Sequence, residues 1–338
     1  MATEAELQTN IIAVVVTYGD RWCYLKTLLA RLENEKLVTS VVIVDNASRV
    51  DVATVCCQAG FKKATVIKQK INIGSAGGFS CGIEYASSLD AEYIMLFDDD
   101  TVPHSTTIDL LLGRLVAINA KSGSCLNAIL PNRDSQQLCL EAKLLENKYW
   151  MLNDSVLGLN VFNFFQRHFL RPIQNKKDAD ASNIIDYGLA AYAGLLFHKN
   201  ICKTIGYPDR AFILYYDDIE YTNRILSAGG KIWICTDLLM DDIVVNYSSS
   251  MMSRPFVGLI FADNDAKVYY QVRNQIYFEY NQLSDYKFVY FTNAVVYAIL
   301  SLMISVLCLR FNRVKAIQTA IYHGLTGVLG LNNNYKLC

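Results

Sequence analysis

The chain has 338 residues, enough for one α/β catalytic domain and an appended module. Its 31 basic and 32 acidic residues nearly cancel, so no overall field favours nucleic acid as a partner, and a bound anion must be held locally. The ten cysteines form no CxxC pair and no zinc-type spacing with histidine, which favours a reduced compartment.

The first residues, MATEAELQTN, lack the basic and apolar regions of a secretory signal. The sequence therefore predicts that the catalytic body stays in the cytosol.

Short apolar runs then alternate with helical patterns. The runs IIAVVV and VVIV are apolar at every position, as expected of strands buried on both faces of a parallel sheet. This alternation predicts β-α-β-α-β-α-β, a doubly wound nucleotide-binding half. The predicted elements are strands at 11–16, 41–44, 65–69 and 93–97 and helices at 24–37 and near 78–88.

The stretch from about 125 to 185 loses this rhythm and includes an aromatic run, VFNFF, at 161–165. We interpret it as a variable insert that faces the acceptor. Regular spacing returns at 190–198. A helix from Asp217 to the Gly229-Gly230 pair and a strand at 231–235 then complete a predicted catalytic domain over residues 1–250.

The C-terminal part, 251–338, is predicted as a helical module that associates with a membrane or oligomerises. Residues 288–309 contain no charge and are long enough to cross a bilayer, with Lys287 and Arg310 at the two ends. Polar residues interrupt the run, and a second apolar helix at about 316–330 could pair with it. An interfacial helix, a true span and a buried soluble helix pair all stay open.

The motif FDDDT places three carboxylates directly after an apolar strand. Adjacent acids repel one another, so a cation must compensate them, and carboxylate and phosphate oxygens suit Mg²⁺ or Mn²⁺. The carboxyl end of a strand is where α/β sheets bind ligands. In an extended segment Asp98 and Asp100 would share one face and Asp99 would point away. A solvated acidic turn is the alternative.

Three further segments follow predicted strands or begin a helix. The small residues of NIGSAGGF would let backbone N–H groups approach a nucleotide phosphate, although a plain tight turn would look similar. Asp45 could accept hydrogen bonds from a ribose or a base, or form an Asx turn. The acids of YYDDIEYTNR could supply a general base or only pair with the helix dipole.

The ordered motifs TYG, VDNAS, NIGSAGGF, FDDDTVP and YYDDIEYTNR resemble the family 2 inverting glycosyltransferases of the GT-A fold. They are most similar to the bacterial galactofuranosyl- and rhamnosyltransferase branch. The likeness covers about residues 11–245 without the insert. It implies an α/β, Rossmann-like mixed sheet and a metal-dependent enzyme that uses Mg²⁺ or Mn²⁺.

The resemblance also implies roles for individual residues. Asp98 and Asp100 would bind the metal, and Asp218 would be the catalytic base. Relatives often have a histidine as the third ligand. This chain has MDD there, so Asp242 is the candidate and Asp241 its rival, because a carboxylate is a competent hard-metal ligand. The nucleotide would contact Thr17, Tyr18, Asp45, Asn46, Asn72, Gly74, Ala76, Gly77, Gly78, Asp98 and Asp99, and the donor or acceptor sugar Tyr192, Gly194, Tyr216, Asp217 and Glu220.

Taken together, the sequence predicts inverting transfer from a nucleotide-diphosphate sugar to a membrane- or lipid-linked glycan at the cytoplasmic face of a membrane. UDP-galactofuranose is the favoured donor and dTDP-rhamnose the next. A sugar-phosphate nucleotidyltransferase is one alternative, although the TYGDRW segment supplies only Arg21 to a phosphate-binding loop. A non-catalytic nucleotide-binding scaffold is the other. The element YYQVRN at 269–274 resembles one found in such bacterial enzymes and has no assigned role.

Overall fold

The structure is a computed structural model that describes residues 10–133, 153–162, 183–244, 255–262 and 264–337. Its contacts divide the chain into two compact units. The sheet unit comprises Met1–Asp134, Asn183–Asp209 and Tyr221–Val244, and the helical unit comprises Ser135–Ser182, Arg210–Glu220 and Val245–Cys338. The helical unit thus includes a short segment, 210–220, that lies inside the predicted catalytic range.

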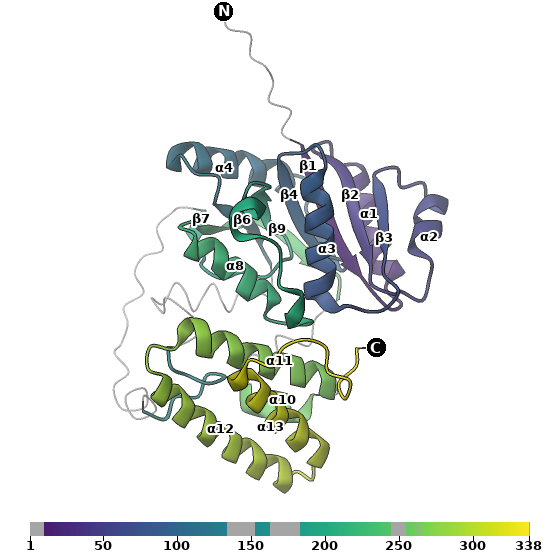
Figure 1. Cartoon of the computed structure of the whole chain (residues 1–338). Coiled ribbons are helices and arrows are strands. Elements are labelled where there is room, and N and C mark those ends of the chain that lie inside the picture. Colours follow the sequence, from purple (N-terminus) through teal and green to yellow (C-terminus); the bar gives the residue numbers. More distant parts are fainter. Residues whose placement is uncertain (1–9, 134–152, 163–182, 245–254, 263, 338) are drawn as a thin grey trace, which may run out of the picture. The chain divides into compact units, whose positions relative to one another are not determined.

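The described residues of the sheet unit form a nine-stranded sheet in the order β3-β2-β1-β4-β8-β6-β9-β5, with β7 paired to β9 (Figure 1). Strand β1 is parallel to β2 and β4, β2 is parallel to β3, and β6 is parallel to β9. The remaining pairs are antiparallel. The strands are β1 Ile11–Thr17, β2 Val38–Asp45, β3 Ala64–Lys68, β4 Tyr93–Asp98, β5 Thr101–Pro103, β6 Ala128–Asn132, β7 Ile184–Asp186, β8 Leu196–His198 and β9 Ile232–Asp242.

Helices cover both faces of this sheet (Figure 1). Alternate residues of β1 point to opposite faces, and the apolar side chains on each face pack against helices. Ile11, Ala13 and Val15 pack in one core with residues of α1 and α4. Val14 and Val16 face the glycines of α3 on the other side. The predicted α/β mixed sheet is therefore confirmed. The helices of this unit are α1 Trp22–Glu33, α2 Val52–Gln58, α3 Gly74–Ser88, α4 Thr107–Ser122 and α7 Ile201–Ile205, and α8 Asp217–Ser227 has its first turn in the helical unit.

Helix α3 lies unusually close to β1 because glycine occupies its contact face. A Cβ atom on Gly82 would lie 2.4 Å from Cγ1 of Val14, and one on Gly78 would lie 2.7 Å from Cγ1 of Val16. Real Cβ atoms do not approach so closely. These two glycines therefore permit the packing of the helix on the sheet.

Several predicted boundaries were wrong. The helix predicted over 24–37 begins at Trp22 and ends at Glu33. The glycine-rich segment predicted as a turn before a helix at 78 is the first turn of α3, which begins at Gly74. The strand predicted at 231–235 continues to Asp242. Most of the predicted insert, including 163–165 of the aromatic run, lies outside the described residues, as does the segment 1–9.

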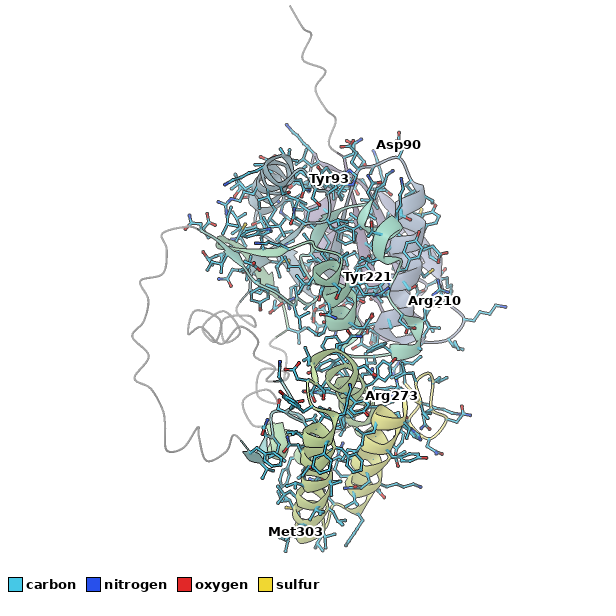
Figure 2. The ribbon with its side chains drawn as sticks, turned by 60° about the vertical axis from the view of Figure 1, so that its left-hand side comes forward. Asp90, Tyr93, Arg210, Tyr221, Arg273 and Met303 are labelled. Carbon is cyan, nitrogen blue, oxygen red and sulfur yellow. The ribbon has the colours of Figure 1, made fainter. Side chains whose placement is uncertain are left out.

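The helical unit has its own core, in which α11 packs along α13. Helix α11 begins where Asn264 accepts hydrogen bonds from the backbone N–H groups of Ala266 and Lys267, a typical N-cap. Arg273, labelled in Figure 2, lies on this helix. The elements are η2 Arg210–Phe212, α10 Pro255–Phe261, α11 Asp265–Phe278, the π-helical turn η3 Glu279–Leu283, α12 Lys287–Leu307 and α13 Phe311–Thr326.

Helix α12 corresponds to the uncharged run, and α13 begins earlier than the helix predicted at 316–330. In the part of the chain that the structure describes, α12 is the one helix long and apolar enough to cross a membrane. Only about a third of it is buried within the protein.

Candidate functional site

The carboxyl ends of β1, β2 and β4 bring three predicted site residues to one edge of the sheet. Thr17 is opposite Asp45 in the parallel register, and Val16 is opposite Asp98. Parallel pairing aligns the carboxyl ends of the strands, so polar residues that follow separate strands lie together at this edge, as predicted.

Arg21 binds two of the three acids that follow β4. One of its Nη atoms lies 2.7 Å from Oδ1 of Asp99 and 2.7 Å from Oδ2 of Asp100, and its Nε donates to Asp99 at 2.8 Å. Thr17 Oγ1 also donates to Asp99 at 2.7 Å. Burial opposes the charge of Arg21, but the hydrogen bonds and charges of both acids outweigh it and raise its pKa. Burial raises the pKa of Asp99, although Arg21 and Thr17 both favour its carboxylate.

The predicted alternation of the three acids was wrong. Asp98 ends β4, but Asp99 and Asp100 form a turn rather than an extended segment. Asp99 and Asp100 therefore converge on Arg21 instead of pointing apart. Thr101 Oγ1 donates to the carbonyl of Asp98 at 2.9 Å and stabilises this turn.

The predicted metal ligands lie on neighbouring segments. Strand β5 pairs with β9 so that Thr101 is opposite Asp242, and the N–H of Ile243 donates to the carbonyl of Asp100 at 2.8 Å. However, Asp242 accepts from Arg133 at 2.7 Å, and Asp100 is held by Arg21. Across the described ranges, no group of three His, Cys, Asp or Glu side chains is placed to hold a metal. In this arrangement arginines hold Asp100 and Asp242, and metal binding by these carboxylates stays a prediction.

The rival ligand Asp241 and the histidines have other partners. Asp241 lies 3.0 Å from Nε2 of the exposed His104. His198 packs edge-on against Tyr93, and His323 lies 2.6 Å from the hydroxyl of Tyr269. These contacts agree with the expected packing and surface roles, while His168 lies outside the described residues.

Asn46 connects the end of β2 to the start of α3. Its Oδ1 accepts from the N–H of Ile73 at 2.9 Å, and its Nδ2 donates to the carbonyl of Gly74 at 2.9 Å. Asn72 Oδ1 accepts from the N–H of Gly74 at 3.0 Å. Both asparagines therefore shape the loop at this sheet edge, and their predicted contact with a nucleotide stays a prediction.

Asp45 has one satisfied and one unsatisfied carboxylate oxygen. Its Oδ1 accepts from the N–H of Ser48, three residues later, at 2.8 Å. An Asx turn uses the N–H two residues later, so this bond is not the turn predicted as the alternative. Its Oδ2 is buried and has no hydrogen-bond partner in the described part of the chain, and the whole residue is 0% exposed. A buried carboxylate oxygen without a donor is costly. Oδ2 of Asp45 is therefore able to accept one further hydrogen bond.

The remaining residues predicted at the nucleotide have mixed exposure. Tyr18 is exposed, with the guanidinium of Arg21 5.4 Å from its ring centre. Ala76 and Gly78 are buried in the packing of α3, and a Cβ on Gly77 would meet Ile73 at 2.9 Å. The structure thus gives the small residues a packing role, and a phosphate contact stays a prediction.

The two predicted sugar contacts of the sheet unit are buried. The Tyr192 ring packs against Phe79 with ring centres 4.3 Å apart. Gly194 has a φ of 85°, and a Cβ there would lie 2.7 Å from Pro131. Packing thus explains both residues, and their sugar contacts stay predictions.

The predicted catalytic base lies in the helical unit, in the first turn of α8. Asp218 is partly exposed and its Oδ1 accepts from the N–H of Ile219 at 2.8 Å, whereas Asp217 is buried. Glu220 is partly exposed, and its N–H donates to the carbonyl of Tyr216. Burial, followed by the charges of Glu279 and Asp218, raises the pKa of Tyr216 well above its usual value.

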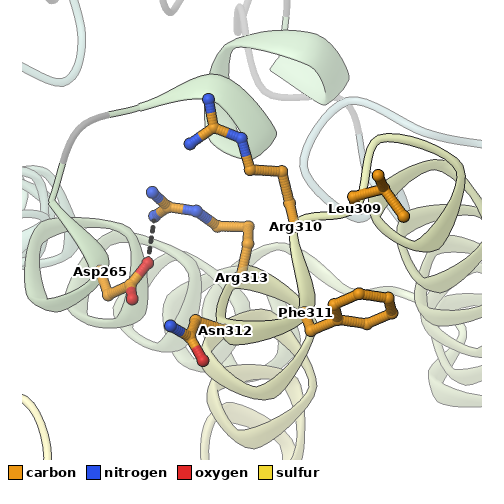
Figure 3. A pocket seen from close by; sticks show the side chains of 6 residues that line it. All are labelled: Asp265, Leu309, Arg310, Phe311, Asn312 and Arg313. Carbon is orange, nitrogen blue, oxygen red and sulfur yellow. Dashed lines mark ion pairs between the residues drawn. The ribbon is translucent and has the colours of Figure 1, made fainter.

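A separate small pocket lies in the helical unit (Figure 3). Arg313 within it forms an ion pair with Asp265 at 3.1 Å. None of the predicted site residues lines this pocket, so it is not the nucleotide site. Its lining residues are Asp265, Leu309, Arg310, Phe311, Asn312 and Arg313.

Sequence reasoning missed the two arginines that hold the acids. Three adjacent carboxylates require compensation, and a metal ion was the inferred cation. Arg21, just after the TYG motif, supplies that compensation to Asp99 and Asp100. It could have been considered, because both segments follow predicted parallel strands, whose carboxyl ends lie at one edge of the sheet. Arg133 gave no comparable signal.

A mixed α/β sheet with polar residues at the carboxyl ends of its parallel strands is the architecture of a nucleotide-binding α/β protein. Residues 12–138 match the model of Glycosyl transferase family 2. Residues 12–138 therefore match the family that the motifs predicted.

Among curated proteins, the chain is similar to galactofuranosyltransferase GlfT1 of Mycolicibacterium smegmatis. The two are 23% identical over 225 residues, which cover 67% of this chain and 68% of the relative. The chain is 24% identical to dTDP-rhamnosyl transferase RfbF of Shigella flexneri over 269 residues, or 79% of each chain.

Among solved structures, the chain is similar to the mannosyltransferase PcManGT from Pyrobaculum calidifontis in complex with GDP-Man and Mn²⁺. It is 12% identical, with a TM-score of 0.49 over 94% of this chain and 86% of that one.

Proposed function

We propose that this chain is an inverting glycosyltransferase that takes a sugar from a nucleotide-diphosphate donor and passes it to a membrane- or lipid-linked glycan in cell-surface polysaccharide synthesis. UDP-galactofuranose is the favoured donor and dTDP-rhamnose the next. The names of the two curated relatives support this choice. The acceptor class is supported by the apolar helix α12.

The observation that carries the donor site is the unsatisfied Oδ2 of Asp45. An N–H of a pyrimidine base or a ribose hydroxyl would satisfy this oxygen, since a carboxylate is an acceptor only. Thr17 and the exposed Tyr18 lie beside it at the end of β1. The nucleotide therefore binds at the sheet edge formed by β1 and β2.

In the proposed reaction, the Asp218 carboxylate takes the proton of an acceptor hydroxyl. The hydroxyl oxygen then forms a bond to the anomeric carbon as the bond from that carbon to the diphosphate breaks. The leaving nucleoside diphosphate keeps the electron pair. One displacement inverts the anomeric configuration and needs no enzyme nucleophile. The clustering of Asp217, Asp218 and Glu220 supports a base here.

The experiment that tests the donor site compares Asp45→Asn with wild type. Asparagine keeps the acceptor for Ser48 but places an N–H₂ donor where Oδ2 lies. We expect binding of UDP to weaken roughly 10- to 100-fold, as for a hydrogen bond to a charged group. Titration calorimetry measures this. The control is Asp51→Asn, because Asp51 is exposed and pairs with Lys68. Equal UDP affinity in both variants would contradict the proposed site.

Donor identity is tested by incubating the full chain with a panel of nucleotide sugars and measuring release of UDP or dTDP. Metal dependence is part of the proposal because carboxylate oxygens are ligands that Mg²⁺ and Mn²⁺ prefer. A bound ion would have to replace Arg21 at Asp100 and Arg133 at Asp242. Treatment with a chelator and restoration with Mg²⁺ or Mn²⁺ tests it. Full activity in the chelator would refute metal dependence.

The proposed site of action is the cytoplasmic surface of a membrane. Large apolar side chains of α12 are exposed, with Phe288 at 79% and Leu307 at 80%. Asn293, Ser301 and Ser305 are buried on its inner side, so the helix is amphipathic within the protein. We propose that this exposed apolar face inserts into one surface of the bilayer. Exposed Lys287 and Arg310 at its ends suit anionic lipids.

Co-sedimentation of the full chain with phosphatidylglycerol vesicles tests this placement. We expect Phe288→Glu to reduce vesicle binding without changing UDP affinity. An unchanged vesicle-bound fraction would contradict it. Tyr322→Glu on α13 is the matched control for an exposed aromatic residue outside this helix.

A further inference from the structure

The element YYQVRN lies on α11, and its last two residues, Arg273 and Asn274, point into the helical unit. Both are 0% exposed. Figure 2 shows Arg273 within this unit. Neither residue has a part in the nucleotide site or in the proposed proton transfer. Their contacts therefore need a separate explanation.

Asn274 binds the backbone of the segment that precedes α8. Its Nδ2 lies 2.8 Å from each of three carbonyl oxygens, those of Phe212, Leu214 and Tyr215. Its Oδ1 accepts from Nε of Arg273 at 2.8 Å, which fixes the orientation of the amide. One side chain thus gathers three carbonyl groups that would otherwise repel one another.

Arg273 extends the same contact. Its Nη atoms donate to the carbonyl oxygens of Phe212 at 2.9 Å, Ala211 at 3.2 Å and Gly330 at 2.6 Å. Its guanidinium lies 4.9 Å from the ring centre of Tyr270. Burial lowers the pKa of Arg273 below its usual value. Burying a cation costs free energy even when carbonyl groups and rings surround it. We therefore asked which part of the backbone these contacts hold in place.

The segment held in this way has an uncommon backbone. Ile213, Tyr215 and Tyr216 have φ values of 65°, 67° and 62°. The left-handed region is unfavourable for residues with a Cβ, and such strain persists only where surrounding contacts enforce it. The two last strained residues directly precede Asp217 and Asp218.

The segment also determines where α8 begins, because the carbonyl of Tyr216 accepts the first helical hydrogen bond from the N–H of Glu220. Strained backbone next to an acidic helix start is a pattern found at active sites. We propose that Arg273 and Asn274 are positioning residues that hold the segment 211–216 and thereby fix the direction of the Asp218 carboxylate. This inference rests on the proposed function of Asp218.

The test compares Asn274→Ala with Asn293→Ala in the full chain. Asn293 is a matched control because it is also 0% exposed in the helical unit and bridges a carbonyl and an N–H, those of Asp154 and Val161. Turnover of UDP-galactofuranose with a soluble alkyl galactofuranoside is measured across pH, together with UDP affinity and thermal unfolding.

We expect Asn274→Ala to lower kcat roughly 10- to 100-fold, the effect of a small misplacement of a catalytic group. Its acid-limb midpoint should shift while UDP affinity is kept. Asn293→Ala should lower the unfolding temperature without moving the midpoint. A midpoint equal to wild type in Asn274→Ala, with activity reduced only in proportion to the unfolded fraction, would overturn the proposal. An equal midpoint shift in Asn293→Ala would also overturn it.

If Asn274→Ala does not fold, Asn274→Ser keeps one hydrogen-bond donor and is read by the same midpoint. The parent assignment is tested separately with Asp218→Asn. Normal transfer by that variant would refute Asp218 as the catalytic base. Arg273 and Asn274 would then have no catalytic group to position. An inactive Asp218→Asn together with a wild-type pH profile for Asn274→Ala refutes the positioning role alone.

Discussion

The strand ends of the sheet unit and the helix start of the helical unit both present acidic residues, but they are held in different ways. Thr17, Asp45 and Asp98 are placed by parallel strand register, and Asp99 and Asp100 both form ion pairs with Arg21. At the start of α8, side chains of α11 hold backbone carbonyls of a left-handed segment. The first arrangement follows from regular secondary structure, and the second depends on tertiary contacts.

This difference separates binding from chemistry in the proposed enzyme. A rigid sheet edge suits a donor that must bind in one position, since the backbone there is fixed by many ladder hydrogen bonds. A strained segment can fix one carboxylate at a helix start that regular hydrogen bonding alone would not orient. Variants at the two regions should therefore affect different measurements.

The largest expected effect is on transfer by Asp218→Asn. Loss of the general base should reduce kcat roughly 10²- to 10⁴-fold, with UDP affinity largely kept because the donor site belongs to the strand edge. Steady-state turnover and calorimetry measure the two quantities. A fall in UDP affinity equal to the fall in kcat would contradict the assignment of donor binding and proton transfer to different regions.

The next largest effect is the pH dependence of stability that comes from Glu279, a buried residue of the helical unit. Its carboxylate accepts from Gln275 at 2.7 Å, Tyr290 at 3.0 Å and the N–H of Leu157 at 3.2 Å, and burial raises its pKa to about 7 from a usual 4.5. The folded state therefore binds more protons than the unfolded state between these values. Stability should fall as pH rises from 4.5 to 7, by up to about 3 kcal/mol.

Glu279→Gln should remove this slope, because the amide is neutral throughout and has a similar shape. The variant should be more stable than wild type at pH 8 and similar to it at pH 4.5. Urea unfolding at both pH values measures the free energy of unfolding. Parallel pH dependences in the two proteins would show that the pKa of Glu279 is the same in the folded and unfolded states.

The smallest effect tests the close approach of α3 to β1 at the strand edge. Gly82→Ala would place a Cβ 2.4 Å from Val14 and should lower stability by about 1–3 kcal/mol through overpacking. Gly113→Ala on α4 is the control, because a Cβ there meets nothing within 4 Å. It should stabilise the protein by about 0.5–1 kcal/mol. Equal changes in the unfolding temperature would contradict the packing role.

The sequence by itself determined the α/β class, the parallel strands and the gathering of Thr17, Asp45 and Asp98 at one edge. These follow from local periodicity and from the rule that parallel strands align their carboxyl ends, both of which depend on near neighbours in the chain. It also contained the motifs that identify the family.

Only the tertiary structure decided which partner each acid has. Arg21 pairs with residues about eighty positions later, and Arg133 pairs with Asp242 from another strand. Asn274 reaches carbonyls some sixty positions earlier. Such contacts carry no local periodic signal, because any arginine or asparagine could satisfy an acid or a carbonyl. Which one does so depends on how distant elements pack.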